Sequence, residues 1–378
     1  MKSNLEENRA RLFKVDEPLQ TFIWAILINR FQVDYFLLLL PSMLVAPHMI
    51  WLILAAGLLA GLQVYGMGKY LDAAGTVSLK KRFAALSENL WVRLMMIAAC
   101  AVITLKLTIF LRGYAGLVHQ YLFPTANTKL FISLIVIGSF LLAKGGLSST
   151  IRFSVIAFIA TFFILLFNVH FLFPSNANYY HLLPLLPQEG TDYSWKSLFT
   201  LWSLHGGPEY ILALTIWAEK KRITPYLLTG HTLTTLEYVF IFTATLLFFG
   251  PSYLQTLQFP VIGLIRYVQL PFFERIEMFV ISLYMTTHIL ICSILVLLMY
   301  GAVRILFKRI HKPTTMKGLF AVHVVLLIYL FIADTLFLST ELTQTIWENI
   351  HLIVSGITFL IVPFLVMFLL RNRKKVVR

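Results

Sequence analysis

Two long stretches of this chain carry no charged side chain. Residues 37–68 and residues 278–303 contain no Asp, Glu, Lys or Arg, and each stretch is longer than the roughly 20 residues that cross the hydrocarbon core of a bilayer. Of the 378 residues, 59% are hydrophobic and 13% are charged, whereas a soluble domain has about 25% charged residues. Because a soluble fold cannot bury this much apolar surface, the sequence predicts an all-α integral membrane protein.

Breaks in the apolar pattern divide the chain into about ten predicted membrane helices. The first five cover residues 18–43, 47–67, 92–122, 128–145 and 151–173, and the other five cover residues 197–218, 224–249, 275–307, 318–338 and 346–370. Between helices seven and eight, residues 250–274 hold three prolines among apolar residues and predict a short helix over the outer vestibule. We expect a single transmembrane domain with a first half at 15–173, a second half at 197–370 and a basic cytoplasmic tail at 371–378.

The positions of the basic residues explain the formal net charge of +14. If the N-terminus lies in the cytoplasm, 24 of the 31 Lys and Arg residues fall in segments predicted to be cytoplasmic. Lys and Arg concentrate in the cytoplasmic loops of membrane proteins. The pattern therefore predicts that both termini are cytoplasmic, agrees with an even number of helices, and argues against a nucleic-acid partner.

Cysteines, histidines and catalytic motifs give no sign of a metal, a cofactor or an enzyme. Cys100 and Cys292 lie in separate apolar runs, and His170, His288 and His323 do not have the spacing of a metal site. We interpret these five residues as packing residues. The sequence also contains no GxxxxGK[ST], HExxH or GxSxG pattern. We therefore expect a protein that is not an enzyme and that needs no cofactor.

The first helix of each predicted half contains polar or helix-breaking residues. In the first helix they run from Asn29 to Asp34 (NRFQVD), and in the sixth they run from Ser203 to Glu209 (SLHGGPE). Interrupted helices at matching positions of two inverted halves point to a midplane binding site in folds of the LeuT type. We therefore expect a LeuT-like inverted repeat of five plus five helices, with a small-molecule site at breaks in both helices.

The sixth helix supplies four candidate ligand-binding residues, His205, Gly206, Gly207 and Glu209. Two glycines and Pro208 weaken a helix in the middle of an apolar span, and the backbone groups that they free become ligand donors and acceptors. A carboxylate near the bilayer centre should pair with a base or bind a cationic group, and the ammonium group of an amino acid would suit Glu209. A Pro kink packed against its neighbours and a salt bridge from Glu209 to a buried base are the structural alternatives.

Three further candidates lie in the first helix, namely Asn29, Arg30 and Gln32. Arg30 could bind a ligand carboxylate in bidentate fashion. The alternative is a structural ion pair with Asp34, which lies one helical turn further along.

Lys106 is the last candidate and lies near the middle of the third predicted helix, too deep to reach the membrane surface easily. It could contact a ligand carboxylate, replace a bound cation or neutralise a buried carboxylate. It could equally hold the third helix to another helix through Glu209 or Glu237.

Short segments spread over nearly the whole chain carry a family resemblance. These segments are Phe259-Pro260, Arg266 and the run Phe273 to Glu277 (FERIE) before the eighth helix, Arg112 in the third helix, Gly145 or Gly146 with Arg152 after the fourth, Leu183-Pro184 before the sixth, and Glu209 within it. In this order and spacing they resemble the B subunits of spore germinant receptors, in the amino acid, polyamine and organocation transporter superfamily. The chain departs from the family in its first helix, where members commonly have a glycine-containing break and this sequence has no glycine before Leu40-Pro41.

The resemblance implies a LeuT-like bundle that senses a small germinant, typically an amino acid, in a complex with A and C subunits in the spore inner membrane. We expect the germinant to reach its site from the outer side and to lie between helices one, three, six and eight. A secondary transporter that moves an amino acid or amine through the same site is the alternative. A third possibility is a structural partner that assembles with other subunits and binds no ligand.

Overall fold

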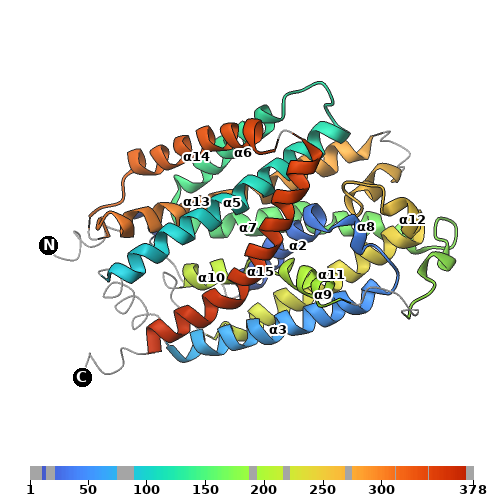
Figure 1. The fold of residues 1–378 in the computed structure, drawn as a ribbon, viewed down its shortest axis with the longest axis horizontal. Coiled ribbons are helices and arrows are strands. Elements are labelled where there is room, and N and C mark those ends of the chain that lie inside the picture. Colours follow the sequence, from blue (N-terminus) through green and yellow to red (C-terminus); the bar gives the residue numbers. More distant parts are fainter. Residues whose placement is uncertain are drawn as a thin grey trace.

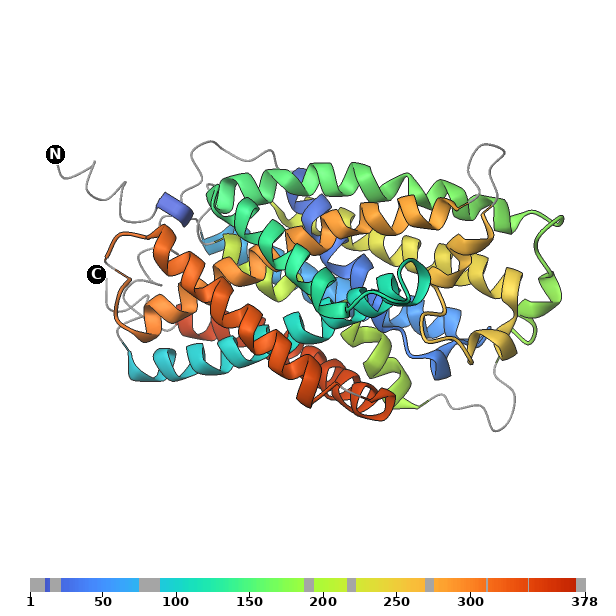
Figure 2. The same ribbon diagram turned by 90° about the horizontal axis from the view of Figure 1, so that it is seen from above.

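The computed structural model describes residues 11–13, 22–74, 89–186, 194–215, 222–268, 275–310, 312–338 and 340–371, and the regular structure in these segments is helical. The long helices lie side by side along the longest axis of the molecule (Figure 1). A view turned by 90° shows the same helices as one continuous bundle (Figure 2). The predicted all-helical architecture is confirmed for these segments.

The helices follow the predicted order along the chain. The first half contains α2 (Phe22–Leu39), α3 (Met49–Ala74), α5 (Leu90–Tyr121), α6 (Thr128–Ala143), and α7 (Gly146–Phe162) followed by α8 (Ile164–Val169). The second half contains α9 (Trp195–Ser203), α10 (Pro208–Thr215), α11 (Thr224–Phe249), α13 (Ile276–Leu306), α14 (Met316–Leu336) and α15 (Glu341–Arg371). Short helical segments are η1 (Arg11–Phe13), η2 (Ser42–Leu44), η3 (His170–Leu172), η4 (Tyr179–Leu182), α12 (Pro251–Leu254) and η5 (Ile262–Tyr267).

Length and composition agree with a polytopic membrane protein. In the described part of the chain, eight helices are long and apolar enough to cross a bilayer, namely α2, α3, α5, α7 with its continuation, α11, α13, α14 and α15. The apolar α6 is shorter, with 16 residues, and α9 and α10 are two half-helices of a further span. The described helices thus match the ten predicted spans, although α3 continues to Ala74 instead of ending near residue 67.

The prediction of a break in the first helix is wrong. α2 is a continuous α-helix from Phe22 to Leu39 and passes through Asn29–Asp34 without interruption. This stretch contains neither Gly nor Pro, so its backbone can keep every helical hydrogen bond. Its polar side chains do not interrupt the backbone, because most of them bind groups on neighbouring helices.

α2 lies at the centre of the bundle. Of its 18 residues 83% are buried inside the protein, compared with 28% of an apolar 18-residue window of the peripheral α14. α11 packs against both α2 and α3, and α13 packs against α5, α6 and α7. α11 approaches α2 so closely that a Cβ atom on Gly230 would overlap the carbonyl oxygen of Ala25 and the side chain of Ile28. Small residues at helix contacts allow such close approach in membrane proteins.

The two ends of the bundle differ. The C-terminal ends of α3, α13 and α15 and the N-terminal end of α5 share one end, and α12 lies at the other (Figure 1). The positive-inside pattern predicts that the first of these ends is cytoplasmic. The predicted short helix at 250–274 is two segments, α12 and η5, and η5 packs on α8 and α13. Residues 269–274, the beginning of the first predicted helix at 18–21 and the tail after Arg371 lie outside the described residues.

Candidate functional site

The predicted break in the sixth helix is present. α9 ends at Ser203 and α10 begins at Pro208, so residues 204–207 leave the helix. Gly207 has φ = +132°, a conformation that side-chain-bearing residues rarely adopt. A Cβ atom on Gly207 would lie 3.0 Å from Cβ of Phe31. The break therefore packs directly against the middle of α2, the backbone conformation there favours glycine, and an added Cβ atom would crowd Phe31.

An ion pair lies beside this break. Nζ of Lys106, on α5, is 3.8 Å from Oε1 of Glu209, at the start of α10. The other oxygen, Oε2 of Glu209, accepts a 2.7 Å hydrogen bond from the backbone N–H of Gly207. The ammonium group of Lys106 also lies 4.1 Å from the ring centres of both Tyr35 and Tyr210, where cation–π attraction stabilises it. The salt bridge from Glu209 to a buried base, one of the two sequence-based alternatives, is therefore present.

This ion pair leaves hydrogen-bonding capacity unused. At 3.8 Å, Nζ of Lys106 and Oε1 of Glu209 are too far apart for a hydrogen bond, and neither atom has a hydrogen-bond partner within the described segments. Both side chains are only 2% exposed. Because buried polar groups are normally paired, these two opposite charges can still bind a ligand that carries both a donor and an acceptor.

Other buried polar side chains near the ion pair also have unused atoms. The atoms that lack a hydrogen-bond partner among the described residues include both carboxylate oxygens of Asp34, the hydroxyl groups of Tyr35 and Thr287, Nε2 of His205 at the break, Nε2 of His288 on α13, and both ring nitrogens of His351 on α15.

Ring contacts connect this group. Tyr35 stacks on Phe110 and on His351, with ring centres 5.9 and 5.7 Å apart, and Phe110 stacks on His288 at 4.5 Å. Oδ2 of Asp34 lies 3.9 Å from Nδ1 of His288. We call Asp34, Tyr35, Lys106, Glu209, His288 and His351 the central polar cluster.

The central polar cluster does not resemble a metal centre. Within the described segments, no group of three or more His, Cys, Asp or Glu side chains is placed to hold a metal ion. Its polar atoms include an ammonium group, a phenol and imidazoles. Such a mixture is suited to a small polar molecule that offers both donors and acceptors.

Arg30 lies in a separate network whose groups already have partners. Its Nη2 donates to both oxygens of Glu237 on α11, at 2.9 and 3.1 Å. Its Nη1 donates to Oγ1 of Thr161 on α7 at 2.7 Å, and its Nε donates to Oδ1 of Asn29 at 2.8 Å. Asn29 in turn donates to Thr234 at 3.2 Å. Arg30 thus pairs with Glu237 rather than with Asp34, and this network joins α2 to α7 and α11.

Gln32 connects α2 to the break. Its Nε2 donates a 2.6 Å hydrogen bond to the carbonyl oxygen of His205, and its Oε1 lies 3.2 Å from Nδ1 of His231. The hydroxyl of Tyr238 lies within hydrogen-bonding distance of two more carbonyl oxygens, those of Gln32 and Leu204. The predicted residues Gln32, His205, Gly206 and Gly207 therefore come together at the break.

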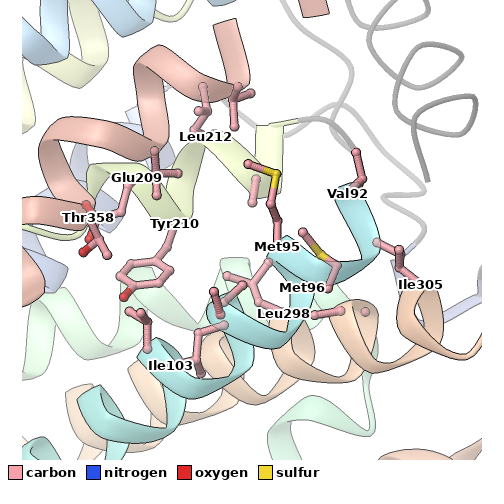
Figure 3. A pocket seen from close by; sticks show the side chains of 18 of the residues that line it. Val92, Met95, Met96, Ile103, Glu209, Tyr210, Leu212, Leu298, Ile305 and Thr358 are labelled. Carbon is pink, nitrogen blue, oxygen red and sulfur yellow. The ribbon is translucent and has the colours of Figure 1, made fainter. Parts of the chain in front are cut away.

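An apolar cavity of about 410 Å³ reaches Glu209 from the end of the bundle that is predicted to be cytoplasmic. Figure 3 shows the side chains around it, which include Met95, Met96 and Ile103 of α5, Glu209 and Tyr210 of α10, Leu298 and Ile305 of α13, and Thr358 of α15. Glu209 is the only carboxylate among the described residues that line it. The cavity therefore forms an apolar path that leads to Glu209, one member of the buried ion pair.

Several members of the central polar cluster were missed in the sequence. His288 was interpreted as a packing residue, and Tyr35 and His351 were not singled out. The signal that could have found them is a polar side chain in an apolar run, which Lys106 also shows. That signal does not show which face of a helix points to the centre of the bundle, because the rotation of each helix about its axis depends on tertiary packing.

A helical bundle with a broken sixth span, and beside it a buried charged cluster whose hydrogen-bonding groups lack partners among the described residues, defines a transporter-like membrane protein. The comparison with protein families supports this class, since the spore germination protein family (Spore_permease) matches residues 18–338. The chain belongs to this family. A search of curated proteins found no match.

Solved structures with the same fold are transporters of the LeuT type. Mhp1, a nucleobase-cation-symport-1 family transporter in a closed conformation with bound bromovinylhydantoin, aligns with a TM-score of 0.60 at 12% identity, over 90% of this chain and 76% of that chain. MhsT in complex with L-phenylalanine gives 0.57 at 10% identity, over 90% and 87%. A mutant of the Eremococcus coleocola manganese transporter gives 0.56 at 12% identity, over 91% and 78%. At these identities the similarity shows the fold alone.

Proposed function

We propose that this chain is the germinant-sensing subunit of a spore nutrient receptor and that it binds a small zwitterion, such as an amino acid, beside the broken sixth helix. The observation that carries the proposal is the pair formed by Lys106 and Glu209. Their charges are opposite and buried, they lie 3.8 Å apart, and in the described part of the chain neither facing atom has a hydrogen-bond partner. An α-amino acid carries a carboxylate and an ammonium group on one carbon atom and matches this pair.

The chemistry of the site favours one orientation of the ligand. The ligand carboxylate accepts hydrogen bonds from Lys106, and the ligand ammonium donates to Oε1 of Glu209. Hydrogen bonds between charged groups are about twice as strong as those between neutral groups. The cavity that reaches Glu209 has an apolar lining, which suits an apolar side chain on the ligand. Glycines 206 and 207 keep the backbone of the break close to the ligand.

Sensing requires that the ligand favour one conformation over another. In the conformation described here, the cavity reaches Glu209 from the predicted cytoplasmic end. A germinant that arrives from the outer side needs a second conformation in which the site opens at the other end. The break between α9 and α10 is a suitable hinge, because broken helices of this fold lie where the two halves move against each other. A and C subunits in the spore inner membrane would read out this change.

The second candidate function is secondary transport of an amino acid or amine through the same site. The observation that favours it is the fold, which the chain shares with an L-phenylalanine complex of MhsT. Uptake of a labelled amino acid by proteoliposomes that contain the purified chain alone would favour transport over sensing.

The test compares germination of spores that carry single substitutions. Lys106→Met and Glu209→Gln are scored against a panel of amino acids, sugars and nucleosides, together with a strain that lacks the chain. The control is Asp334→Asn, which removes an ion pair between α14 and Arg112 of α5 that lies outside the central polar cluster. Immunoblots confirm equal amounts of each variant in the membrane.

We expect both site variants, like the deletion strain, to lose the response to one nutrient, and Asp334→Asn to keep it. A normal response of both site variants to every nutrient would refute a ligand site at Lys106 and Glu209.

A further inference from the structure

His231, on α11, is a buried histidine whose two ring nitrogens both face oxygen atoms. Nε2 lies 2.7 Å from the carbonyl oxygen of Gly57 on α3, and Nδ1 lies 3.2 Å from Oε1 of Gln32 on α2. The side chain is 3% exposed, so bulk water does not replace either contact. Two acceptors therefore meet one imidazole.

A neutral imidazole cannot satisfy both acceptors. It carries one N–H group, and its other nitrogen is an acceptor. Because a carbonyl oxygen only accepts hydrogen bonds, Nε2 of His231 must carry a proton toward Gly57. In the neutral ring, Nδ1 then presents its lone pair to the lone pairs of the Gln32 oxygen.

Rotating the side chains does not remove the conflict. If the amide of Gln32 turns over, its oxygen meets the carbonyl oxygen of His205, which now accepts a 2.6 Å hydrogen bond from Nε2 of Gln32. If the ring of His231 turns over, carbon atoms replace nitrogens at both contacts and both hydrogen bonds are lost. All three contacts are satisfied together only when His231 carries a proton on each nitrogen.

We propose that His231 is a proton-binding site and that its occupancy is linked to the conformation of the break between α9 and α10. A continuous series of hydrogen bonds runs from Gly57 on α3 through His231 and Gln32 to the carbonyl of His205 at the break. The second proton of His231 completes this series. The site uses neither Lys106 nor Glu209, so its two hydrogen-bond contacts lie outside the ion pair of the proposed ligand site.

The linkage follows from the cost of a buried charge. An imidazolium away from water is costly unless hydrogen bonds satisfy it, so His231 holds its second proton only while both acceptors are aligned. When the break moves, Gln32 loses its contact with His205, its amide is free to turn, and the neutral ring is satisfied. Motion of the break therefore releases the proton, and by linkage proton binding favours the conformation described here.

The titratable groups around His231 do not supply a counter-charge. The ring of His205 has its centre 5.3 Å from that of His231, and its Nδ1 donates to the carbonyl of Leu201. Tyr238 on α11 lies against His205 at 4.9 Å. Arg30 on α2 is paired with Glu237, and α3 meets the ring with the backbone of Gly57 and with Gly61.

Asp34, the remaining charged residue of α2 in this region, lies toward α13, where Oδ2 is 3.9 Å from His288. Proton binding at His231 thus adds a positive charge held mainly by the carbonyl of Gly57 and the amide of Gln32.

The first experiment measures the protonation state directly. The full chain is labelled with ¹⁵N-histidine and reconstituted in nanodiscs, and the His231 signal is identified by its loss in His231→Gln. We expect this signal to be that of an imidazolium, with both nitrogens protonated, at a pH near 5. A neutral signal throughout the range from about pH 5 to 8, where histidine ordinarily titrates, would overturn the proposal.

The second experiment measures the linkage. In a chain whose Cys100 and Cys292 are replaced with Ser, a cysteine at Ala99, which lines the cavity, reports accessibility through its rate of reaction with a maleimide. Because the reactive thiolate becomes more abundant as the pH rises, each rate is divided by that of the same chain denatured at the same pH. We expect this normalised accessibility to depend on pH when His231 is present, and His231→Gln to abolish the dependence. The control is His323→Gln on α14, a buried histidine whose Nδ1 bonds its own helix, and it should keep the dependence.

Gln32→Glu keeps the test decisive if His231→Gln does not fold. A carboxylate at position 32 pairs with the imidazolium, and an opposite charge this close shifts a titration by about 1 unit or more. Because this carboxylate no longer donates to the carbonyl of His205, the titration is read from the ¹⁵N signal of His231 itself, and we expect its midpoint to move to higher pH by this amount. An unmoved midpoint, or pH dependence that survives in His231→Gln, would refute a proton site at His231.

Discussion

The guanidinium of Arg30 and the carboxylate of Glu237 form a bifurcated contact at the centre of the bundle, since the single nitrogen Nη2 donates to both carboxylate oxygens at 2.9 and 3.1 Å. The two side chains are 2% and 3% exposed. Nη2 thus binds α11, while Nη1 binds Thr161 on α7. Arg30 therefore fixes the central helix α2 against two helices, one from each half of the chain.

Breaking this pair should destabilise the protein strongly. Glu237→Leu leaves the Arg30 guanidinium buried without its counter-charge, and removal of one partner of a buried pair costs about 3–5 kcal/mol. The double variant Arg30→Met/Glu237→Leu should recover most of the loss, because two apolar side chains replace the buried charges. The thermal unfolding midpoint in detergent measures both effects.

The control for this prediction is Glu277→Gln. Glu277 pairs with Arg275 at 2.8 Å, but the Arg275 side chain is 53% exposed, and such pairs contribute about 0–1 kcal/mol. Equal destabilisation by Glu277→Gln and Glu237→Leu would contradict a special role of the buried pair.

Gly207 should not tolerate a side chain. Its φ of +132° places it in a region where a residue with a Cβ atom is strained by about 1–3 kcal/mol, and the added carbon would lie 3.0 Å from Phe31. We expect Gly207→Ala to lower the thermal midpoint and to weaken ligand binding, measured by calorimetry on the purified chain. Retention of both properties would show that the break can adopt another backbone conformation.

How far the sequence predicts this structure depends on the kind of signal. The membrane helices follow from charge-free apolar runs, and the bounds of α11 agree with the prediction because Pro225 and Gly250 mark its ends. The break before α10 follows from Gly206, Gly207 and Pro208, whose effect on the backbone is local. Such signals can be recognised in the sequence because Gly and Pro affect the backbone at their own positions, without contacts to other helices.

The first helix shows where this reasoning fails. The polar residues from Asn29 to Asp34 predict a break, but polar side chains do not break a helix when partners such as Glu237 and the carbonyl of His205 lie on neighbouring segments. The pairing of Lys106 with Glu209 was one of several open alternatives. The roles of Tyr35 and His351 were not foreseen, because they depend on which face of α2 and α15 meets the centre.

Gly230 should be essential for the contact between α2 and α11. A Cβ atom at this position would overlap the backbone of Ala25 and the side chain of Ile28, and overpacking a buried contact costs about 1–3 kcal/mol. The matched control is Gly66→Ala on α3, where an added Cβ would meet no atom of the described residues within 4 Å beyond the nearby backbone of its own helix. Since Ala favours a helix over Gly by about 1 kcal/mol, Gly66→Ala should be neutral or stabilising.

Both variants are compared by thermal unfolding in the same detergent. A lower midpoint is expected for Gly230→Ala alone. If Gly230→Ala were as stable as Gly66→Ala, α2 and α11 would have to lie further apart at Gly230 than described here.

The cavity at Glu209 should be accessible from the cytoplasm. The chain contains two cysteines, Cys100 and Cys292, and replacing both with Ser gives a background without thiols. In this background Ala99→Cys, in the lining of the cavity, should react with a membrane-impermeant maleimide added to inside-out vesicles. Ala115→Cys, on the same helix but 0% exposed, should not react. Reaction of Ala99→Cys only in right-side-out vesicles would reverse the orientation that the basic residues predict, and protection from both sides would mean that the cavity is closed in the membrane.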